Sequence, residues 1–328
     1  MKKITSISLA VLITLLFFSS CEKKISAPKA GEAKAEDMLN LIPKDANAVF
    51  FVDINKAMSA EIVKKTITED KNYEKYQEFI EKTGIDPQKD IYFAAIGITK
   101  GIADEQAEGV AIINLKYDKD ILLSKIKDEM EKEEESLQEE EYNKIKIYNA
   151  KDKKGEGSFA FLDSSNIVIG NSDKVKSVLN ILNKKEENIF NNETLSSLIK
   201  RTKKDAIFWG ALDIPSEAIN EATSKNPMLN SLSAIHAVCL YFDYQNKNII
   251  SEIKAISADK TKNQQIADQL TGLKAFGSSI ATEKPEIGEL INNIEITTGD
   301  DYVKIYSIIP EELISKIKGK MESSPDKN

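Results

Sequence analysis

Short apolar runs alternate with longer amphipathic segments along most of the chain. Continuous or alternating apolar residues predict β-strands, which we expect at 48–53, 91–98, 110–117, 144–149, 158–162, 167–170, 236–244, 249–256, 294–297 and 303–308. Apolar residues at helical spacing predict helices, which we expect within 55–83, 118–142, 174–183, 216–232, 259–276 and 311–321. Short polar loops between neighbouring strands favour antiparallel pairing. The pattern therefore predicts an α+β fold, with helices packed on one face of a mostly antiparallel sheet.

A short motif occurs twice in the chain. Lys44-Asp45-Ala46 and Asp53-Ile54 recur in the second half, both at the same offset, as Lys204-Asp205-Ala206 and Asp213-Ile214, and each copy encloses an apolar strand. The order of the later strands and helices is also similar in the two halves. These observations favour an internal duplication. We expect two related lobes, 41–187 and 188–321, each with its own sheet.

The segment 1–21 combines a basic start, an apolar run and a small-residue end. Two lysines precede the apolar residues 4–18, and two serines precede Cys21. Fifteen helical residues reach about 22 Å, short of the ~30 Å hydrocarbon core of a bilayer. This pattern is typical of a secretory signal, so we expect residues 1–20 to be a signal peptide.

The same segment resembles the signals of bacterial lipoproteins, because Ser19 and Ser20 fit the lipobox ahead of Cys21. The resemblance implies that Cys21 is lipidated, with palmitate among its acyl chains, and becomes the amino terminus after cleavage. An ordinary signal peptide with an incidental cysteine is the alternative. Two or more acyl chains anchor a protein stably, so membrane lipid is the first expected partner.

Both ends of the mature chain are polar. Residues 22–37 are rich in Lys, Glu and Ala and have no strand or helix period long enough to be buried. We therefore expect residues 21–40 to be the lipidated cysteine and a flexible stalk, with a reach of about 55 Å at full extension. At the other end, we expect residues 322–328 to be a disordered tail.

The body also resembles a group of uncharacterised envelope lipoproteins of unknown function. Their mature body begins with an I-P-x-D-A segment and a strand ending in V-D, here Ile42–Ala46 and Val52-Asp53. A later pair of segments also matches, here 158–163 and 167–172. The resemblance implies a duplicated, extracytoplasmic domain that is lipid-anchored in the cell envelope, at the periplasmic face or the cell surface. It supplies no catalytic residues.

The composition is that of a folded, acidic protein. Of the 328 residues, 41% are apolar, which excludes a wholly disordered chain. Removal of Lys2 and Lys3 with the signal would leave 43 basic against 53 acidic residues, a formal balance of −10. This balance does not suit nucleic acid, because affinity there depends on neutralised phosphates. Arg201 is the one arginine, so bidentate clamps on phosphate or carboxylate are nearly unavailable.

Histidine and cysteine are scarce. His236 is the single histidine, and Cys239 is the one thiol left after lipidation of Cys21. Residues three apart on a strand point to opposite faces, so these two side chains do not form a local dyad. One imidazole also gives little basis for a zinc site or a Ser/His/Asp triad. We therefore expect a buried thiol and a partly exposed or hydrogen-bonded ring in structural roles.

Carboxylates are plentiful, but their pattern favours solvent exposure. The densest cluster lies on the predicted helix 118–142 and comprises Glu129, Glu131, Glu133, Glu134, Glu135, Glu139, Glu140 and Glu141. A solvated acidic face explains this cluster better than a metal site. Asp53 and Asp213 are a more attractive pair, and we expect both to cap the helix that follows. Residues 272–279 (GLKAFGSS) lack the G-K-[ST] ending of a phosphate loop and are discarded.

We predict no catalytic residues, no metal or other cofactor, and no enzyme. The leading hypothesis is a membrane-anchored lipoprotein of unknown molecular function, a non-enzymatic binding or structural protein with another envelope protein as candidate partner. The first alternative is a small-ligand or lipid-binding protein, and the second is a carboxylate-dependent envelope hydrolase. The leading hypothesis needs an exposed patch, the first alternative a large apolar pocket, and the second two converging acids.

Overall fold

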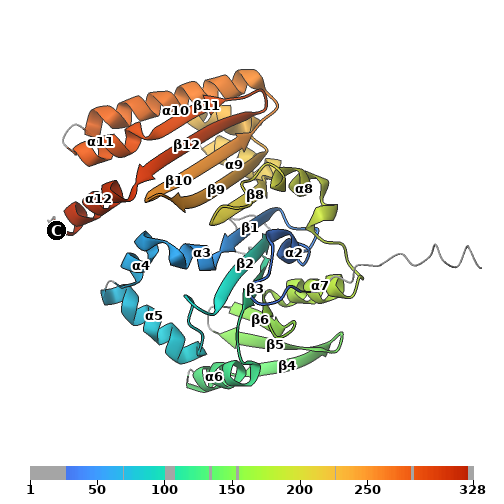
Figure 1. Ribbon diagram of the computed structural model, residues 1–328. Coiled ribbons are helices and arrows are strands. Elements are labelled where there is room, and N and C mark those ends of the chain that lie inside the picture. Colours follow the sequence, from blue (N-terminus) through green and yellow to red (C-terminus); the bar gives the residue numbers. More distant parts are fainter. Residues whose placement is uncertain are drawn as a thin grey trace, which may run out of the picture.

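The computed structural model describes residues 27–68, 70–99, 108–132, 135–152, 155–225, 227–281 and 284–323. Within these residues, twelve strands form one sheet that runs through the molecule (Figure 1). The strands are β1 (Ala48–Asp53), β2 (Ile91–Ile98), β3 (Gly109–Leu115), β4 (Leu137–Tyr142), β5 (Ile145–Asp152), β6 (Gly155–Phe161), β7 (Asn166–Gly170), β8 (Phe208–Asp213), β9 (Ala237–Gln245), β10 (Asn248–Ile256), β11 (Ile294–Thr298) and β12 (Tyr302–Pro310). Their spatial order is β11-β12-β10-β9-β8-β1-β2-β3-β7-β6-β5-β4. Every neighbouring pair is antiparallel, so the prediction of an α+β fold is confirmed.

Two of the hairpins have turns that the local sequence specifies. Asn143 and Lys144 join β4 to β5 with φ angles of 50° and 67°. Asn246 and Lys247 join β9 to β10 with φ angles of 51° and 60°. Two central residues with positive φ match the twist of the flanking strands, and asparagine tolerates this conformation better than most residues. The Asn-Lys turns therefore help to fix the register of both hairpins.

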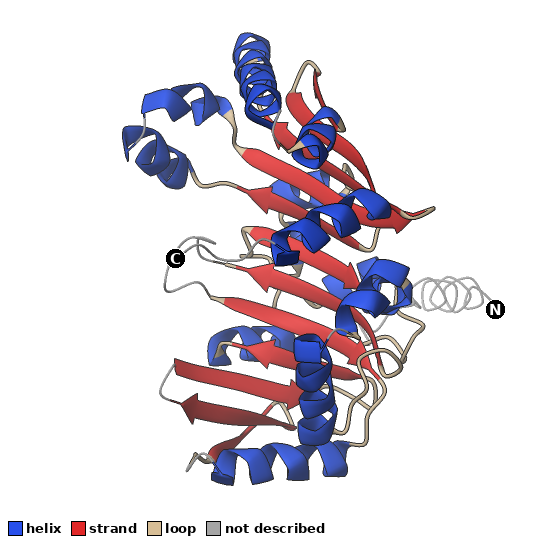
Figure 2. Ribbon diagram, turned by 90° about the vertical axis from the view of Figure 1, so that its left-hand side faces the viewer, coloured by secondary structure: helices blue, strands red, loops and turns tan. Residues whose placement is uncertain are grey.

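Helices cover both faces of the sheet (Figure 2). They are α2 (Ala35–Leu39), α3 (Ile54–Ser59), α4 (Glu61–Ile67), α5 (Asp70–Thr83), α6 (Lys119–Lys132), α7 (Ser172–Leu182), α8 (Glu193–Ile199), α9 (Ser216–Lys225), α10 (Lys260–Ile280), α11 (Pro285–Asn292) and α12 (Glu311–Ser323), with the 3₁₀-helices η1 (Ile189–Asn191) and η2 (Pro227–Ala234). The sheet face that packs against α2, α7 and α8 is called the α7 face here. The opposite face, which packs against α6 and α10, is called the α10 face.

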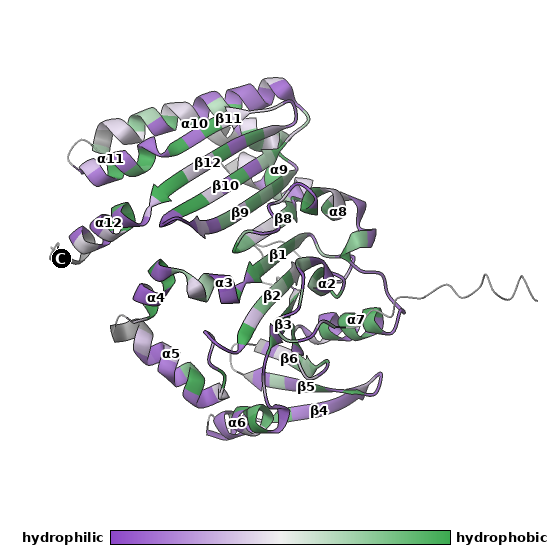
Figure 3. Ribbon diagram, viewed as in Figure 1, coloured by the Kyte–Doolittle hydropathy of each residue, from purple (hydrophilic) through white to green (hydrophobic). Residues whose placement is uncertain are grey.

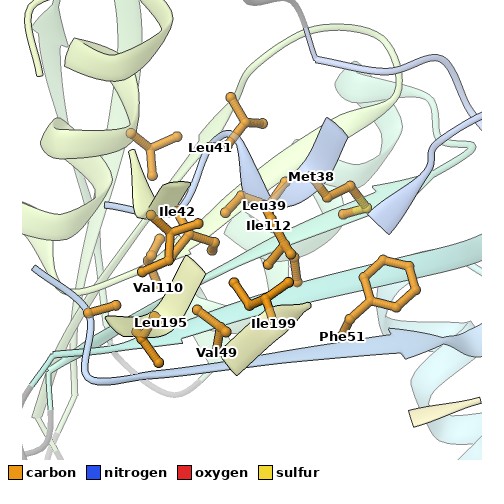
Figure 4. Close-up of a cluster of buried hydrophobic side chains, with 14 of the residues drawn as sticks. Met38, Leu39, Leu41, Ile42, Val49, Phe51, Val110, Ile112, Leu195 and Ile199 are labelled. Carbon is orange, nitrogen blue, oxygen red and sulfur yellow. The ribbon is translucent and has the colours of Figure 1, made fainter. Parts of the chain in front are cut away.

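The main core lies on the α7 face. Alternate side chains of the strands meet the buried sides of α2, α7 and α8 there. Figure 4 shows the part of this core that α2 and α8 contribute. In the middle of this core the ring of Phe51 stacks on that of Trp209, with centroids 5.7 Å apart. Smaller cores lie on the α10 face, one with Leu122 of α6 and one with Ile266 of α10. Burial of each large apolar side chain contributes about 1.5–3 kcal/mol, so the sheet is stabilised from both sides.

The two halves of the sheet meet where β1 pairs with β8. Phe50 lies opposite Gly210, the equivalent residue in the second copy of the repeated motif. Two backbone hydrogen bonds at the ends of this strand pair are likewise made by equivalent residues of the two halves. The amides of Asp53 and Asp213 each donate, at 2.8 Å, to the residue that precedes the other half's strand. The constant offset of the repeat in the sequence is therefore a pseudo-twofold relation in space, with its axis between Phe50 and Gly210.

Outward from this axis the halves follow one order of strands. The first half runs β1-β2-β3-β7-β6 and the second β8-β9-β10-β12-β11, while the hairpin β4–β5 extends the first half alone. This shared order is what the internal repeat predicts, and the expected boundary at residue 188 lies between α7 and α8. The expectation of a separate sheet in each lobe needs correction. The two sheets are one, because β1 and β8 pair with each other.

Three other expectations differ from the structure. Helices lie on both faces of the sheet, because several central strands are apolar on both sides and bury both. The helix expected over 118–142 ends at Lys132 as α6, and residues 137–142 are the edge strand β4. An edge strand tolerates consecutive charged residues because its side chains reach solvent.

The third difference concerns the predicted stalk. Residues 27–40 are part of the folded body, where Met38 and Leu39 of α2 are fully buried in the main core. Apolar residues too few to show a helical period are enough to dock a short segment once the sheet provides the other half of the contact. Residues 1–26, with the signal and Cys21, lie outside the described part of the chain. So do residues 324–328 of the predicted tail, whereas α12 continues to Ser323.

Candidate functional site

The middle of the α10 face carries apolar side chains that remain accessible to solvent. α6 packs on the first-half part of this face and α10 on the second-half part. On the strands around the centre, the accessible side chains form what is called here the central apolar face: Phe50, Val52, Ile96, Ile169, Phe208, Leu212, Leu240, Phe242 and Ile253. The hydrophobic colouring of β1 and β2 is visible in Figure 3. A contiguous apolar surface is a candidate for an interaction site.

Three phenylalanines form the middle of this surface. The rings of Phe50 and Phe208 stack with centroids 5.8 Å apart, and Phe208 lies 5.9 Å from Phe242. Gly210 leaves the space that the Phe50 ring fills, since a Cβ at position 210 would lie 2.4 Å from a ring carbon. The exposed fraction rises outward, to 41% at Phe242 and 38% at Ile253. The surface therefore combines a packed aromatic centre with an open apolar margin.

A buried charged cluster joins the halves on the opposite face of the sheet, the α7 face. The carboxylate of Asp243 in β9 is fully buried and accepts hydrogen bonds from Lys56 of α3 at 2.9 Å and from Lys203 at 3.0 Å. Burial by itself would raise the pKa of Asp243, but the hydrogen bonds from the two lysines outweigh it and lower the pKa to about 2. Lys56 belongs to the first half and Asp243 to the second, so the cluster fixes α3 against the second half.

A second set of contacts holds α4 near the start of α12. Glu311 accepts hydrogen bonds from the ammonium of Lys65 and the hydroxyl of Tyr244. Burial and the hydrogen bond to Glu311 raise the pKa of Tyr244 to about 12. Lys247 lies 3.4 Å from Glu61 of α4. These contacts and the Asp243 cluster have all their charges paired within the fold, so we assign them a structural role.

His236 and Cys239 are placed as the sequence predicts. Cys239 is 3% exposed on the α7 face, and its thiol donates to the carbonyl oxygen of Leu198 at 3.5 Å. Burial raises the pKa of this thiol to about 11, which suppresses the thiolate needed for nucleophilic chemistry. His236 is exposed immediately before β9. The expectation of a buried thiol and an accessible ring is confirmed.

The acidic cluster is divided between two elements. Glu129 lies on α6, whereas Glu139 lies on β4 and accepts hydrogen bonds from Lys146 at 2.8 Å and Lys127 at 3.0 Å. These two hydrogen bonds lower the pKa of Glu139. In the described ranges, no group of three His, Cys, Asp or Glu side chains is arranged to hold a metal ion. Two members of the predicted cluster, at 133 and 134, lie outside those ranges.

The two candidate capping aspartates behave differently. Asp53 caps α3, because its carboxylate accepts a hydrogen bond from the amide of Lys56 at 2.8 Å, and burial raises its pKa. The prediction is wrong for Asp213, since α9 begins three residues later at Ser216, after Pro215. Proline fixes the backbone one residue before the helix and moves the start beyond reach of the aspartate. The discarded segment 272–279 lies inside α10.

The two best-formed surface pockets are lined mainly by polar groups. One has a volume of about 530 Å³ and lies beside β11, with Lys274, Asn292 and Glu295 in its lining. The other has about 590 Å³ and lies between β4, β5 and β6, with Asn149 and Glu156 in its lining. Neither has the apolar lining that is usual for sites of small organic ligands. The central apolar face is therefore the stronger candidate.

Two features of the sequence indicate functional surfaces although neither is a known motif. Phe50 and Phe51 are adjacent in β1, so apolar side chains point to both faces of that strand. Asn114 and Asn166 each stand in an otherwise apolar strand, where a buried polar group needs a specific partner. Neither signal shows by itself whether the chain or another molecule covers the position.

Across the ranges that the structure describes, no helix has the length and apolar character needed to cross a bilayer. No family model and no curated protein matches the sequence. Among solved structures, the chain is similar to TP0453 in several crystal forms. Crystal form I matches with 11% identity and a TM-score of 0.46, over 86% of this chain and 96% of that chain. Crystal form III matches with 10% identity and a TM-score of 0.45, over 86% and 97% of the two chains.

Proposed function

We propose that this protein is a lipid-anchored, non-enzymatic binding protein of the bacterial cell envelope, whose central apolar face binds an amphipathic helix of a partner protein. The observation that carries the proposal is the solvent exposure of Phe242, Ile253 and Ile169 on one face of the sheet. Membrane anchoring is supported by the resemblance of residues 1–21 to lipoprotein signals.

The two faces of the sheet differ in a way that supports binding over a solely structural role. Where the α7 face is open to solvent, over β10 and β12, it carries the charged side chains of Glu252, Lys254 and Lys304. On the α10 face of β8, β9 and β10, which is also partly accessible, none of the strand residues is charged. Apolar area covered by a partner contributes about 25 cal/mol per Å², so an accessible apolar surface is useful chiefly to a protein that binds.

The neighbouring helices indicate the shape of the occupant. α6 and α10 lie on the same sheet face, on opposite sides of the central strands. A helix with its side chains is about 10 Å thick, and an occupant of that thickness would continue the layer that these two helices form. A second sheet would have to displace them. An acyl chain would be buried on one side only, whereas binding sites usually enclose small ligands.

Charge favours a partner helix with a basic polar side. The chain without its predicted signal peptide has a formal balance of −10. A helix that buries an apolar stripe on the sheet leaves its polar side facing water. Lysine and arginine on that side would be attracted by the acidic body, which speeds association and disfavours acidic competitors.

A photo-reactive phenylalanine analogue at position 242 of the full-length protein tests the occupant in living cells. We expect a cross-link to a protein, at a peptide that forms an amphipathic helix when the site is mapped by mass spectrometry. The matched control carries the same analogue at Ile308, which is 43% exposed on the α7 face. We expect much weaker cross-linking there, because that position is outside the central apolar face.

Three outcomes would contradict the proposed occupant. Cross-linking of position 242 to lipid would favour the lipid-binding alternative, and cross-linking to a second copy would indicate self-association. Equal cross-linking at positions 242 and 308 would remove the distinction between the two faces.

Anchoring is tested separately. Cys21→Ser should move the protein from the detergent phase to the aqueous phase of a Triton partition, because the acyl chains would be missing. A variant that still partitions like the wild type would show that the lipoprotein interpretation is wrong.

A further inference from the structure

The first described residues are strapped across the end of two central strands. Residues 27–34, called the strap here, precede α2 and run over the α7 face of β3 and β7. The amide of Gly31 donates to Asn114 Oδ1 at 3.0 Å, and Asn114 Nδ2 lies 3.2 Å from the carbonyl oxygens of Pro28 and Lys29. Asn166 Nδ2 donates to the same Pro28 carbonyl at 2.5 Å. Two side chains thus bind three backbone groups of the strap.

These two asparagines occupy positions where a core residue is otherwise expected. Both are fully buried and opposite each other in the pairing of β3 with β7, and Asn114 Nδ2 donates to Asn166 Oδ1 at 2.9 Å. The next residues on the same face in the two strands are Ile112 and Val168, which belong to the main core. Buried amides are tolerated only when their polar atoms are hydrogen-bonded. The strap provides those bonds, so the pair is built to receive it.

The strap has a conformation that its sequence permits. Gly31 has φ of +72°, a region that glycine reaches without the cost that other residues incur. A Cβ at this position would meet the ring of Tyr92 at 3.4 Å. Ala33 is buried against the main core, and α2 follows immediately. The strap is therefore held along its whole length.

We propose that Asn114 and Asn166 form a clamp that shortens the membrane tether, so that the turn between β6 and β7 is held next to the bilayer. This inference rests on the proposed lipidation of Cys21. Ala27 follows Cys21 by only six positions, a length of chain that spans at most about 21 Å whatever its conformation. With the strap released, the tether would extend to α2 and span about 49 Å.

The clamp also selects which end of the molecule faces the membrane. Asn166 is the first residue of β7, and its side chain lies 3.0 Å from Asp163 in the turn that precedes the strand. The exposed Ser164 of that turn is therefore close to the point where the tether leaves the body. Thr298, at the far end of the edge strand β11, is eight strands away from β7. At about 4.8 Å per strand, this separation is about 38 Å.

Single fluorophores on the lipidated full-length protein test this orientation. Cysteines introduced at Ser164 or Thr298 are labelled selectively, because Cys239 is buried with a raised thiol pKa. The protein is bound to phosphatidylcholine vesicles that contain an acceptor-labelled lipid. We expect strong energy transfer from position 164 and weak transfer from position 298. Equal transfer from the two positions would overturn the proposal.

Release of the strap should remove the difference between the two labels. Gly31→Pro removes the amide that donates to Asn114 and cannot adopt the positive φ, while Gly31 itself is exposed and outside the core. In this variant, and in Asn114→Ala, we expect transfer from position 164 to fall toward that from position 298. Asn263→Ala is the matched control, because Asn263 is a fully buried asparagine of α10 without contact to the strap. Unchanged transfer in Gly31→Pro would contradict the clamp.

Proteolysis in detergent solution separates the clamp from the anchor. We expect trypsin to cleave after Lys29 and Lys34 several times faster in Gly31→Pro than in the wild type, with no change in Asn263→Ala. This result does not depend on lipidation, so it supports the clamp even when the protein fails to bind vesicles, which would count against the anchor alone. Equal cleavage rates in the wild type and Gly31→Pro would show that the strap is not clamped.

Discussion

On the α7 face, each half has a row of side chains that crosses its strands. The row of the first half is apolar and buried, whereas the row of the second half includes charged residues. In the first half, successive strands from β2 to β5 contribute Ala95, Ile112, Val168, Ala160 and Ile147, all fully buried. In the second half, the equivalent strands from β9 to β11 contribute Cys239, Lys254, Lys304 and Thr297. Both rows start from equivalent residues of β1 and β8, Phe51 and Ala211, which the offset of the internal repeat relates.

The helices that follow the two rows explain the difference. α7 follows β7 and packs its apolar side on the first row. α12 follows β12, the equivalent strand, but packs beside α11, and the second row passes from the buried Cys239 to the partly exposed Lys254 and Lys304. An antiparallel sheet is stable with one face in water when that face is polar. The same order of strands can therefore support a sheet face that a helix covers or one that stays partly exposed. The row is apolar where a helix packs on it and carries lysines where no helix of the described ranges does.

Exchange of one residue between the rows should give the largest effect. Ile112→Lys places a charge under α7 and α2, and we expect it to lower the free energy of unfolding by about 4 kcal/mol or more. The reciprocal Lys254→Ile changes a position whose side chain is 20% exposed and is not covered by α7 or α2, and we expect less than about 1 kcal/mol. Urea denaturation followed by circular dichroism measures both. If the two variants lose similar amounts of unfolding free energy, the two rows are not buried to different extents.

The junction between the halves gives the next effect. Gly210→Ala forces the ring of Phe50 to move, because the added Cβ would lie 2.4 Å from it, and we expect a loss of up to about 3 kcal/mol. Phe50→Ala in the same chain should reduce the penalty, since the two changes share one space. Gly272→Ala is the control, because nothing lies within 4 Å of its added Cβ on α10. There we expect a gain of about 0.5–1 kcal/mol. If Gly210→Ala unfolds at the same urea concentration as the wild type, the ring of Phe50 does not depend on the space at Gly210.

Acid should weaken the contact of α3 with the second half. The pKa of Asp243 is about 2 in the fold and lies near 3.9 in an unfolded chain. Because the folded value is the lower one, the stabilisation is present above pH 4 and lost as pH falls from about 4 to 2. It is on the order of 2 kcal/mol. Urea midpoints measured across this range should fall more steeply for the wild type than for Asp243→Asn, and parallel curves would remove this role for the carboxylate.

The smallest effects are expected at Cys239 and His236, the two residues whose side chains are candidates for nucleophilic or acid–base chemistry. Cys239→Ala removes one buried sulfur and should cost about 1 kcal/mol, while His236→Ala changes an exposed ring and should cost less than about 0.5 kcal/mol. Both variants should keep any cellular phenotype of the wild type. Loss of the phenotype in a variant that still folds and reaches the membrane would mean that a reactive site has been mistaken for a structural one.

Several elements were determined by local sequence. The bounds of β1 and β2 are those expected from their apolar runs, because each run is framed by polar or turn-forming residues on both sides. β4 was not predictable in this way, since Leu137–Tyr142 continues the helical spacing of the preceding segment and is rich in glutamate. Its strand conformation depends on hydrogen bonds to β5, across the Asn-Lys turn. Local propensity gave way there to pairing.

The sequence by itself determined the fold class and the burial of Cys239, because both follow from composition and from the pattern of apolar positions. The tertiary structure decided which parts of the sheet are covered. Asn114 and Asn166 receive the strap from a distant part of the sequence, and Phe242 remains accessible because the helices of the described chain pack on either side of it. Burial depends on contacts between segments that are distant in the sequence. The identity of one apolar or polar residue therefore does not tell which segment, if any, will bury it.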